Sequence, residues 1–293
     1  MFTELAKRIN FPDEAIAELK EKHELLMSRP ELYAELYNAM DEFFIIGDRT
    51  FIGTLDKIAE KAEIPNYTVH MIFLLLAARP LRYVYRQQGI AEEIYYDTLS
   101  DLACKLMECK KVHNVWGTFV GWWYPDMYRC KIVKLGRMEY ERIGFPYDDY
   151  KGILKKGDVV YNCHIPSSGP VTRESVIESL KRAYEFFKDE LRDGILPVYC
   201  SSWMIYPKHK EIYGENSNLR KFYELFDIID AVENQSNHNF WRIFNVDYSP
   251  ETLDSAPEDT SLQRGFKAYI KQGNCMGTGK GVLLFDGEKI INL

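Results

Sequence analysis

A turn of small residues between positions 161 and 175 has the composition of an anion site. A predicted strand ends near His164, the segment 164–170 reads HIPSSGP, and a predicted helix follows. Small residues in such a turn let several backbone N–H groups point outward together, and a helix N-terminus adds about half a positive charge. The residues expected to surround the anion are His164, Ser167, Ser168, Gly169 and Thr172. An ordinary strand-to-helix turn is the alternative.

A tyrosine further along the chain could supply a proton. Tyr223 follows Asn216 by seven residues, which is close to two helical turns, so a helix would place both on one face. A phenol is protonated at neutral pH and can act as a general acid. The alternative is that Tyr223 is a core aromatic residue.

Two glutamates could accept a proton. Glu139 and Glu141 alternate along a predicted strand and would share one of its faces. Either carboxylate could deprotonate an incoming ammonium group, directly or through water. The alternative is a solvated strand face, on which these carboxylates pair with Arg137 or Arg142.

Three further motifs are weaker. Cys200, in the segment CSSW, could be a nucleophile, but a buried structural thiol is favoured because no base partner is evident. Residues 276–281 (MGTGKG) lack the first glycine of a P-loop and have Gly281 where Ser or Thr should bind magnesium. Cys163-His164 has no second ligand pair at close spacing, so no metal is expected.

Composition indicates the class of protein that carries these residues. The 293 residues are 46% hydrophobic and 28% charged, with a net charge of −7 and a pI near 5.5. These values predict a folded protein that binds neither nucleic acid nor a membrane, because no basic tract occurs and the longest apolar run is Met71–Ala78. No signal peptide or CxxC pair is visible among the six cysteines, so a cytoplasmic location is expected.

Hydrophobic periodicity predicts a helical domain over residues 1–110 and a mixed α/β domain over 111–293. In the first domain we expect Pro30 to open one helix and Thr54 to cap another, Leu55–Ala62. A buried helix should end at Arg79-Pro80, and Tyr95–Cys109 should be helical. The strands predicted in the second domain are Cys130–Arg142, Val159–Ile165, Ile195–Ile205, Phe240–Asn245 and Gly281–Phe285. The helices predicted there are Val176–Phe187, Asn218–Ile229 and Leu262–Lys271.

Two segments resemble the GNAT acyltransferases. Their pyrophosphate loop follows Gln/Arg-x-x-Gly-x-Gly/Ala, and the matching positions here are His164, Ser167 and Gly169, of which only Gly169 fits outright. Their later motif Asn-x-x-Ala-x-x-Leu-Tyr-Glu corresponds to residues 216–224, NSNLRKFYE, with the asparagine and tyrosine at the same spacing.

Over nearly its whole length the chain resembles a bacterial family of acyltransferases with a helical N-terminal domain and a GNAT-like C-terminal domain. The segments that carry this resemblance are LGRMEYE (135–141), HIPSSGP (164–170), CSSWMIYP (200–207), NSNLRKF (216–222), Arg242-x-Phe244 and SLQR (261–264). The resemblance implies a fold of class α+β or α/β: a mixed sheet flanked by helices, behind a helical domain.

The resemblance also implies a reaction, transfer of an acyl group from acetyl-CoA or another acyl-CoA to a small-molecule acceptor, expected to be an amine. It places the pyrophosphate at the 164–172 loop and Asn216, and the thioester beside Cys200, Ser202 and Trp203. Tyr223 would protonate the leaving thiolate, and Glu139 would be the base. The alternative function is a regulatory module that binds acyl-CoA or another small ligand without turnover. Acceptor, acyl length and oligomeric state stay open at this stage.

Overall fold

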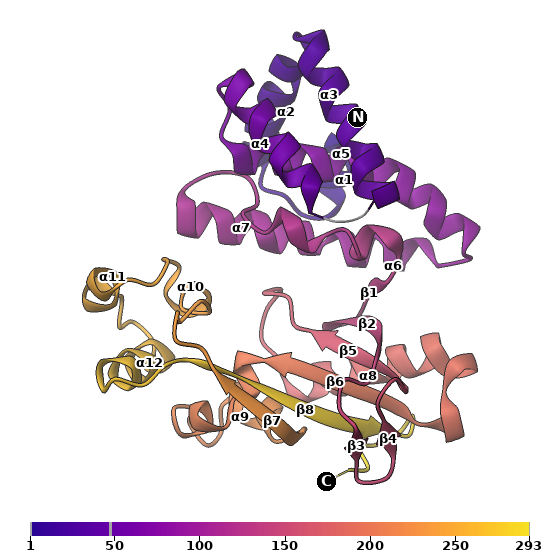
Figure 1. Cartoon of the computed structure of the whole chain (residues 1–293), viewed down its shortest axis with the longest axis vertical. Coiled ribbons are helices and arrows are strands. Elements are labelled where there is room, and N and C mark those ends of the chain that lie inside the picture. Colours follow the sequence, from indigo (N-terminus) through magenta and orange to yellow (C-terminus); the bar gives the residue numbers. More distant parts are fainter. Residues whose placement is uncertain (1, 47–48, 293) are drawn as a thin grey trace. The chain divides into compact units, whose positions relative to one another are not determined.

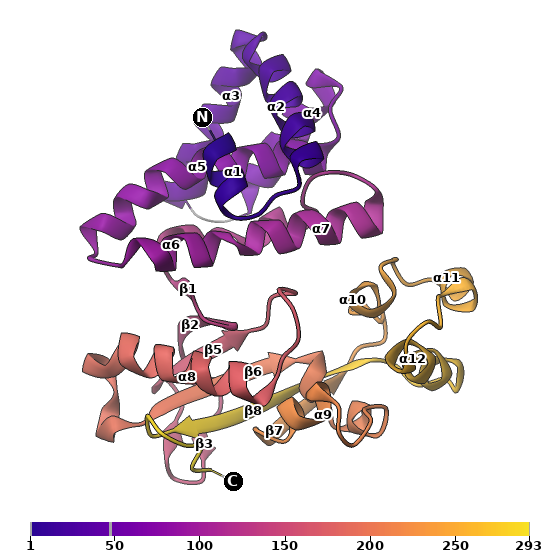
Figure 2. The same ribbon diagram turned by 180° about the vertical axis from the view of Figure 1, so that it is seen from behind.

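The computed structural model describes residues 2–46 and 49–292, and the chain divides into two units, Met1–Val133 and Lys134–Leu293. Figures 1 and 2 show a helical N-terminal unit and a C-terminal unit built on a sheet. This architecture confirms the predicted fold class.

Helices make up the N-terminal unit because its apolar residues recur at helical spacing. Its elements are α1 (Thr3–Arg8), α2 (Asp13–Met27), α3 (Pro30–Asp41), the π-helical turn η1 (Glu42–Ile46), α4 (Thr50–Ala62), α5 (Asn66–Gln87), α6 (Glu92–Leu99), α7 (Asp101–His113) and the 3₁₀ turns η2 (Gly121–Trp123) and η3 (Met127–Arg129). Pro30 opens α3, as expected. None of residues 2–46 and 49–110 lies in a strand.

Three local predictions in this unit are wrong. Helix α5 continues through Pro80 to Gln87, because burial of Leu81 and Tyr85 beyond the proline favours the helix despite the lost hydrogen bond. Thr54 lies inside α4 and donates to the Glu42 carboxylate instead of capping a helix. The helix expected over Tyr95–Cys109 is two helices, α6 and α7.

The division between the units falls after Val133, later than the predicted change near residue 111. Residues 114–131 contain turns rather than strands, and they are bound to α5. The Thr68 hydroxyl donates to the carbonyl of Trp116, and the buried Tyr128 hydroxyl donates to the carbonyl of Leu74. These side-chain-to-backbone bonds tie the connecting segment to the helices.

A six-stranded mixed sheet, in the order β1-β2-β5-β6-β8-β7, forms the centre of the C-terminal unit. Its strands are β1 (Ile132–Leu135), β2 (Met138–Gly144), β5 (Val159–His164), β6 (Leu196–Ser202), β7 (Asp227–Glu233) and β8 (Gly277–Phe285). A separate two-stranded sheet consists of β3 (Asp149–Tyr150) and β4 (Leu154–Lys155). Strands β5 and β6 pair in parallel, across a connection that contains α8 (Arg173–Phe187).

The two faces of this sheet are covered differently. Helix α8 packs on one face, where Ser179 accepts from the backbone N–H of Met138. The β3–β4 hairpin packs on the other face, with the Tyr150 hydroxyl bonded to Asp227 of β7. Figure 1 is viewed from the hairpin side and Figure 2 from the side of α8 and of α9 (Asn218–Tyr223).

A small helical lobe completes the C-terminal unit. It contains α10 (Trp241–Phe244), α11 (Pro250–Ser255) and α12 (Ser261–Lys271), packed around the buried Phe266. The short 3₁₀ segments are η4 (Lys188–Glu190), η5 (Arg192–Gly194), η6 (Trp203–Ile205) and η7 (Pro207–Glu211). Trp203 of η6 packs edge-on against Phe266, so the lobe contacts the end of β6.

Three predicted elements of the C-terminal unit need correction. The strand expected over Cys130–Arg142 is the β1–β2 hairpin, because Gly136 adopts a positive φ of 76° and starts a turn. Phe240–Asn245 is helical, since its aromatic residues pack into the lobe rather than across a sheet. The helix expected over Asn218–Ile229 ends at Tyr223, and the edge strand β7 follows.

Glycine in β8 allows the segment after β6 to lie directly against the sheet. A Cβ on Gly279 would come within 1.9 Å of the carbonyl oxygen of Ile205. We therefore expect Gly279→Ala to lower the free energy of unfolding by at least about 2 kcal/mol, because backbone must move to admit the methyl group.

Gly214→Ala is the matched control. Gly214 lacks a positive φ, and among the described residues no atom outside Gly214 and its two chain neighbours lies within 4 Å of the point that a Cβ would occupy there. Urea titration of both variants measures the difference, and Gly214→Ala should change the free energy of unfolding by less than about 0.5 kcal/mol. Equal losses in the two variants would contradict the close packing of η6 on β8.

Candidate functional site

The parallel ladder between β5 and β6 is short. Their register has only two pairs, Tyr161 with Val198 and Asn162 with Tyr199. Beyond these pairs β5 remains paired with β2 as far as His164, and β6 remains paired with β8 as far as Ser202. The edges of β5 and β6 that face one another there lack a ladder, which leaves backbone polar groups for another partner.

The predicted anion loop follows β5 at this opening. Ser167, Ser168 and Gly169 are exposed, and Gly169 has a φ of 122°, a conformation suited to glycine. Arg137, in the turn of the β1–β2 hairpin, donates to the carbonyls of Gly169 (2.7 Å) and Pro170 (3.1 Å). The sequence did not predict this contact, in which a side chain from another turn holds the loop by two of its carbonyl groups.

At the start of α8, two residues already use the helix N-terminus. The Thr172 hydroxyl accepts from the backbone N–H of Ser175 at 3.1 Å, so it is an N-cap. A hydrogen bond from its own backbone N–H, and next the Thr172 hydroxyl, lowers the pKa of Glu174. The first turn therefore does bind an anionic group, and that group is the Glu174 carboxylate.

Tyr223 and Asn216 are not on one helical face. Helix α9 begins at Asn218 after the N-cap Ser217, so Asn216 lies in the preceding loop, where it is exposed. Tyr223 ends α9 and is partly buried, with the Lys210 ammonium 5.1 Å from the centre of its ring. Burial raises the pKa of Tyr223 above its ordinary value, so the phenol is protonated at neutral pH.

A polar cluster on β2 and β5 lies beside the opening. Glu141 and His164 are 3.0 Å apart, from Oε2 to Nε2, and the Asn162 amide donates to the same carboxylate oxygen at 3.2 Å. The two side chains of the pair are about one-fifth exposed, at 22% for Glu141 and 21% for His164. A carboxylate that orients an imidazole is a recurring general-base arrangement.

Glu139 occupies a different environment from Glu141. It is directly opposite His164 in the β2–β5 register, but it is only 2% exposed, while Glu141 reaches the surface. The geometry thus favours Glu141 with His164 over Glu139 as the proton acceptor. Alternation in the sequence does place residues 139 and 141 on one face of β2, and residues 162 and 164 on one face of β5. The register between β2 and β5, which brings Glu141 to His164, could not be predicted from the sequence.

Cys200 lies in the interior of the sheet. It is 0% exposed, and both a hydrogen bond with Cys163 on β5 and burial raise its pKa well above the ordinary value. A thiol in this state is a poor nucleophile. The preferred interpretation, a buried structural thiol, fits this environment, and direct contact of Cys200 with a substrate does not.

Ser202 and Trp203 form the turn at the end of β6. The Ser202 hydroxyl accepts from the backbone N–H of Met204 at 3.2 Å and thus caps η6. Trp203 is partly buried against the helical lobe, and its carbonyl accepts from Nδ1 of His209 at 2.8 Å. Because Nε2 of the same ring accepts from the Gly277 N–H at 3.3 Å, neutral His209 links η6 to β8.

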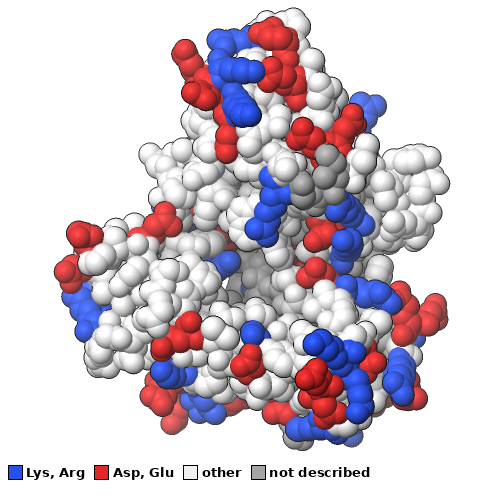
Figure 3. All heavy atoms as spheres, viewed as in Figure 1, with Lys and Arg blue, Asp and Glu red and all other residues white. Residues whose placement is uncertain are grey.

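On the face drawn in Figure 3, Lys and Arg side chains alternate with Asp and Glu side chains. Across residues 2–46 and 49–292 no group of three or more His, Cys, Asp or Glu is arranged to bind a metal ion. No helix within these described ranges is long and apolar enough to cross a membrane.

Comparison with protein families accounts for nearly the whole chain. Residues 2–130 match the model of an N-acyltransferase N-terminal domain, and residues 132–283 match the model of a GNAT-like C-terminal domain. No curated protein sequence matches significantly.

Solved structures share the fold. A mutant acyltransferase in complex with octanoyl-CoA superimposes with a TM-score of 0.75 at 20% identity, covering 95% of this chain and 86% of the other. An acyltransferase in complex with decanoyl-CoA and teicoplanin gives a TM-score of 0.71, with the same identity and coverage. A third, bound to CoA and 10C-teicoplanin, gives 0.63 at 19% identity over 96% of this chain and 98% of that one. At this identity the likeness establishes the fold alone.

The link made by His209 predicts a pH-dependent stability. Burial lowers the pKa of His209 to about 4, whereas an exposed histidine titrates near 6.5. Between these pH values the unfolded chain binds a proton that the folded chain does not. The stability that depends on neutral His209 is therefore fully present above about pH 6.5 and is lost as the pH falls toward 4. From pH 7 to 5 the parent should lose about 2 kcal/mol more unfolding free energy than His209→Gln, which cannot titrate.

Denaturant titrations at the two pH values measure this difference. The other histidines are common to both proteins, so their contributions cancel. Parallel pH dependences for parent and His209→Gln would show that the ring is not held neutral between Trp203 and Gly277.

Proposed function

We propose a reaction for this chain, which belongs to the family of N-acyltransferases with a GNAT-like C-terminal domain: it transfers an acyl group from acyl-coenzyme A to an amine. The observation that carries the proposal is the end of the β5–β6 ladder after two register pairs, beside the polar cluster of Glu141, Asn162 and His164. A thioester and a proton acceptor can meet at such an opening.

The donor would bind along the separated strand edges. The pantetheine arm of coenzyme A carries two amides in an extended chain, and these can hydrogen-bond to strand backbone that lacks a partner. The pyrophosphate would then lie at the exposed turn of Ser167, Ser168 and Gly169. There it must compete with the Glu174 carboxylate for the first turn of α8.

The acceptor would be activated by the Glu141–His164 pair. Because Nε2 of His164 donates to the Glu141 carboxylate, the other ring nitrogen, Nδ1, would take a proton from the acceptor ammonium group. The neutral amine then attacks the thioester carbonyl, forms the C–N bond and breaks the C–S bond. The second proton lost from nitrogen replaces, through solvent, the proton that the general acid gives to the thiolate. A backbone N–H near Ser201–Trp203, at the end of β6, is the proposed donor to the developing oxyanion.

Tyr223 remains our proposed general acid. The departing thiolate of coenzyme A needs a proton, and the phenol of Tyr223 is protonated at neutral pH because burial raises its pKa. Among the described residues no hydrogen bond engages its hydroxyl, so the proton is available for donation.

The solved structures suggest which substrates to try first. They contain octanoyl-CoA, decanoyl-CoA and a glycopeptide, so we propose a medium-chain acyl-CoA as donor and an amine on a molecule larger than an amino acid as acceptor. Release of free coenzyme A thiol from octanoyl-CoA, with and without a panel of amines, tests the reaction. Tight binding of octanoyl-CoA with no thiol release would favour the regulatory module over the enzyme.

The pyrophosphate position predicts an effect of charge in the loop. Ser168→Glu should weaken coenzyme A binding by about 1–3 kcal/mol, because it adds a carboxylate close to the phosphates. Glu174→Gln is the informative counterpart, since it removes the carboxylate that already uses the helix N-terminus, and it should bind coenzyme A as tightly as the parent or more tightly. Calorimetry measures both; unchanged affinity in Ser168→Glu, or weaker binding in Glu174→Gln, would count against this position.

The role of Tyr223 predicts a separation of rate from stability. Tyr223→Phe keeps the ring beneath Lys210 and removes the proton donor. Single-turnover thiol release should slow by about 10²–10⁴-fold, while coenzyme A affinity and the melting temperature hardly change. A Phe variant that melts earlier yet reacts at the parental rate would identify Tyr223 as a packing residue.

A further inference from the structure

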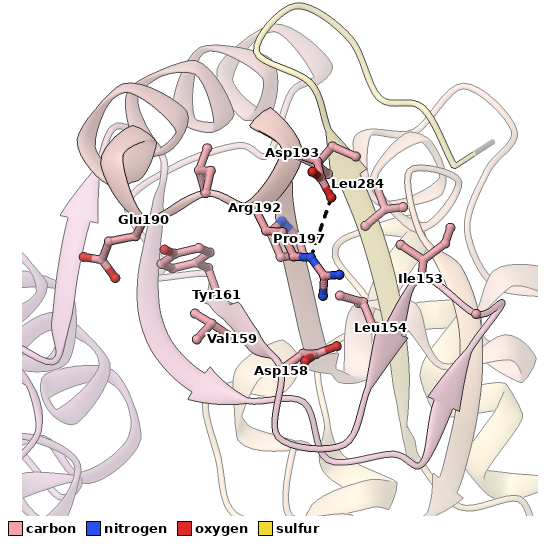
Figure 4. A pocket seen from close by; sticks show the side chains of 13 residues that line it. Ile153, Leu154, Asp158, Val159, Tyr161, Glu190, Arg192, Asp193, Pro197 and Leu284 are labelled. Atoms are coloured by element: carbon pink, nitrogen blue, oxygen red, sulfur yellow. Dashed lines mark ion pairs between the residues drawn. The ribbon is translucent and has the colours of Figure 1, made fainter.

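A pocket lies at the amino ends of β5 and β6. Its volume is about 460 Å³, and it is bordered by the β3–β4 hairpin, by the segment from Glu190 to Ile195, and by the beginnings of β5 and β6. Its apolar walls are formed by Ile153, Leu154, Val159, Ile195, Pro197 and Leu284. Figure 4 shows Ile153, Leu154, Val159, Pro197 and Leu284 around a central space.

This pocket is separate from the opening proposed for acyl transfer. Val159 lines the pocket and His164 borders the opening, at the two ends of β5. Five residue steps along a strand span about 16 Å. A ligand of ordinary size in the pocket would therefore leave the acyl-transfer site accessible.

The charges around the pocket are unevenly compensated. Glu190 is paired with Arg142, and Arg192 on the rim is paired with Asp193. Asp158 takes part in none of the ion pairs among the described residues; its Oδ2 accepts only the backbone N–H of Lys155 at 2.7 Å. In Figure 4 its carboxylate lies beside Val159 and Leu154, so a partly buried anionic group adjoins an apolar wall.

Tyr161 adds an unused hydrogen-bonding group. Its side chain lines the pocket and is 1% exposed, and its buried hydroxyl has no hydrogen-bond partner among the described residues. Burial raises the pKa of Tyr161 to about 12, so the hydroxyl stays neutral and can donate or accept. A buried polar group without a partner is costly, and a bound molecule can satisfy it.

We propose that this pocket is a second small-molecule site, which binds an amphipathic amine with an apolar body and a cationic ammonium group. The apolar body fills the space between Leu154, Ile195 and Leu284, and the ammonium group pairs with Asp158. A neutral apolar compound would leave the carboxylate uncompensated, and an anionic one would be repelled by Asp158 and Glu190.

Phenethylamine is a suitable probe, with 2-phenylethanol as its uncharged analogue. Calorimetry or NMR titration of the whole chain should show saturable phenethylamine binding, with a dissociation constant in the range of about 0.1–3 mM expected for so small a ligand. Binding of 2-phenylethanol should be at least about tenfold weaker. Saturating coenzyme A should change the phenethylamine affinity by less than about twofold from its value without coenzyme A, because the two sites are separate.

Two variants on the same rim locate the binding. Asp158→Asn keeps an oxygen for the Lys155 N–H and removes the charge, so phenethylamine affinity should fall at least about tenfold with an unchanged melting temperature. Arg192→Gln removes a nearby charge that the ligand does not need, so affinity should stay the same or improve. Absence of saturation up to about 10 mM, equal affinities in parent and Asp158→Asn, or competition with coenzyme A would each overturn the proposal.

Discussion

Backbone pairing between β5 and β6 ends at Asn162 and Tyr199, and the rest of the proposed site depends on this break in the ladder. The ladders on either side are longer, with six residue pairs between β2 and β5 and seven between β6 and β8. Where a ladder ends inside a sheet, the two strands need support on their outer edges and a partner for the backbone groups between them. Strands β2 and β8 support the outer edges, and we propose that the acyl donor is the partner between β5 and β6.

The neighbouring features keep the two diverging ends in place. Arg137 holds the loop after β5 by its carbonyls, whereas His209 holds the turn after β6 against β8. Gly279 permits the close approach of that turn to the sheet. These contacts are distributed over residues distant in sequence, yet all act on the few backbone groups that would meet the thioester and the pyrophosphate.

The sequence predicted the fold class and the location of the loop, but not how the polar side chains meet. Alternation in Met138–Gly144 and Val159–His164 revealed two strands, and helical spacing revealed α8. The pair of Glu141 and His164 depends on the β2–β5 register, which local patterns do not specify. Likewise the seven-residue spacing of Asn216 and Tyr223 suggested one continuous helix, whereas Ser217 caps α9 after Asn216. Predictions failed where long-range packing decided the local structure.

The central claim, that the acyl donor lies between the diverging ends of β5 and β6, is tested most directly by hydrogen–deuterium exchange with and without coenzyme A. Peptides spanning residues 163–170 and 199–204 should exchange more slowly when coenzyme A is bound, because their backbone amides gain partners. Peptides from the β3–β4 hairpin, residues 149–155, should be unaffected. Saturable coenzyme A binding that leaves exchange in 163–170 and 199–204 unchanged would contradict the account.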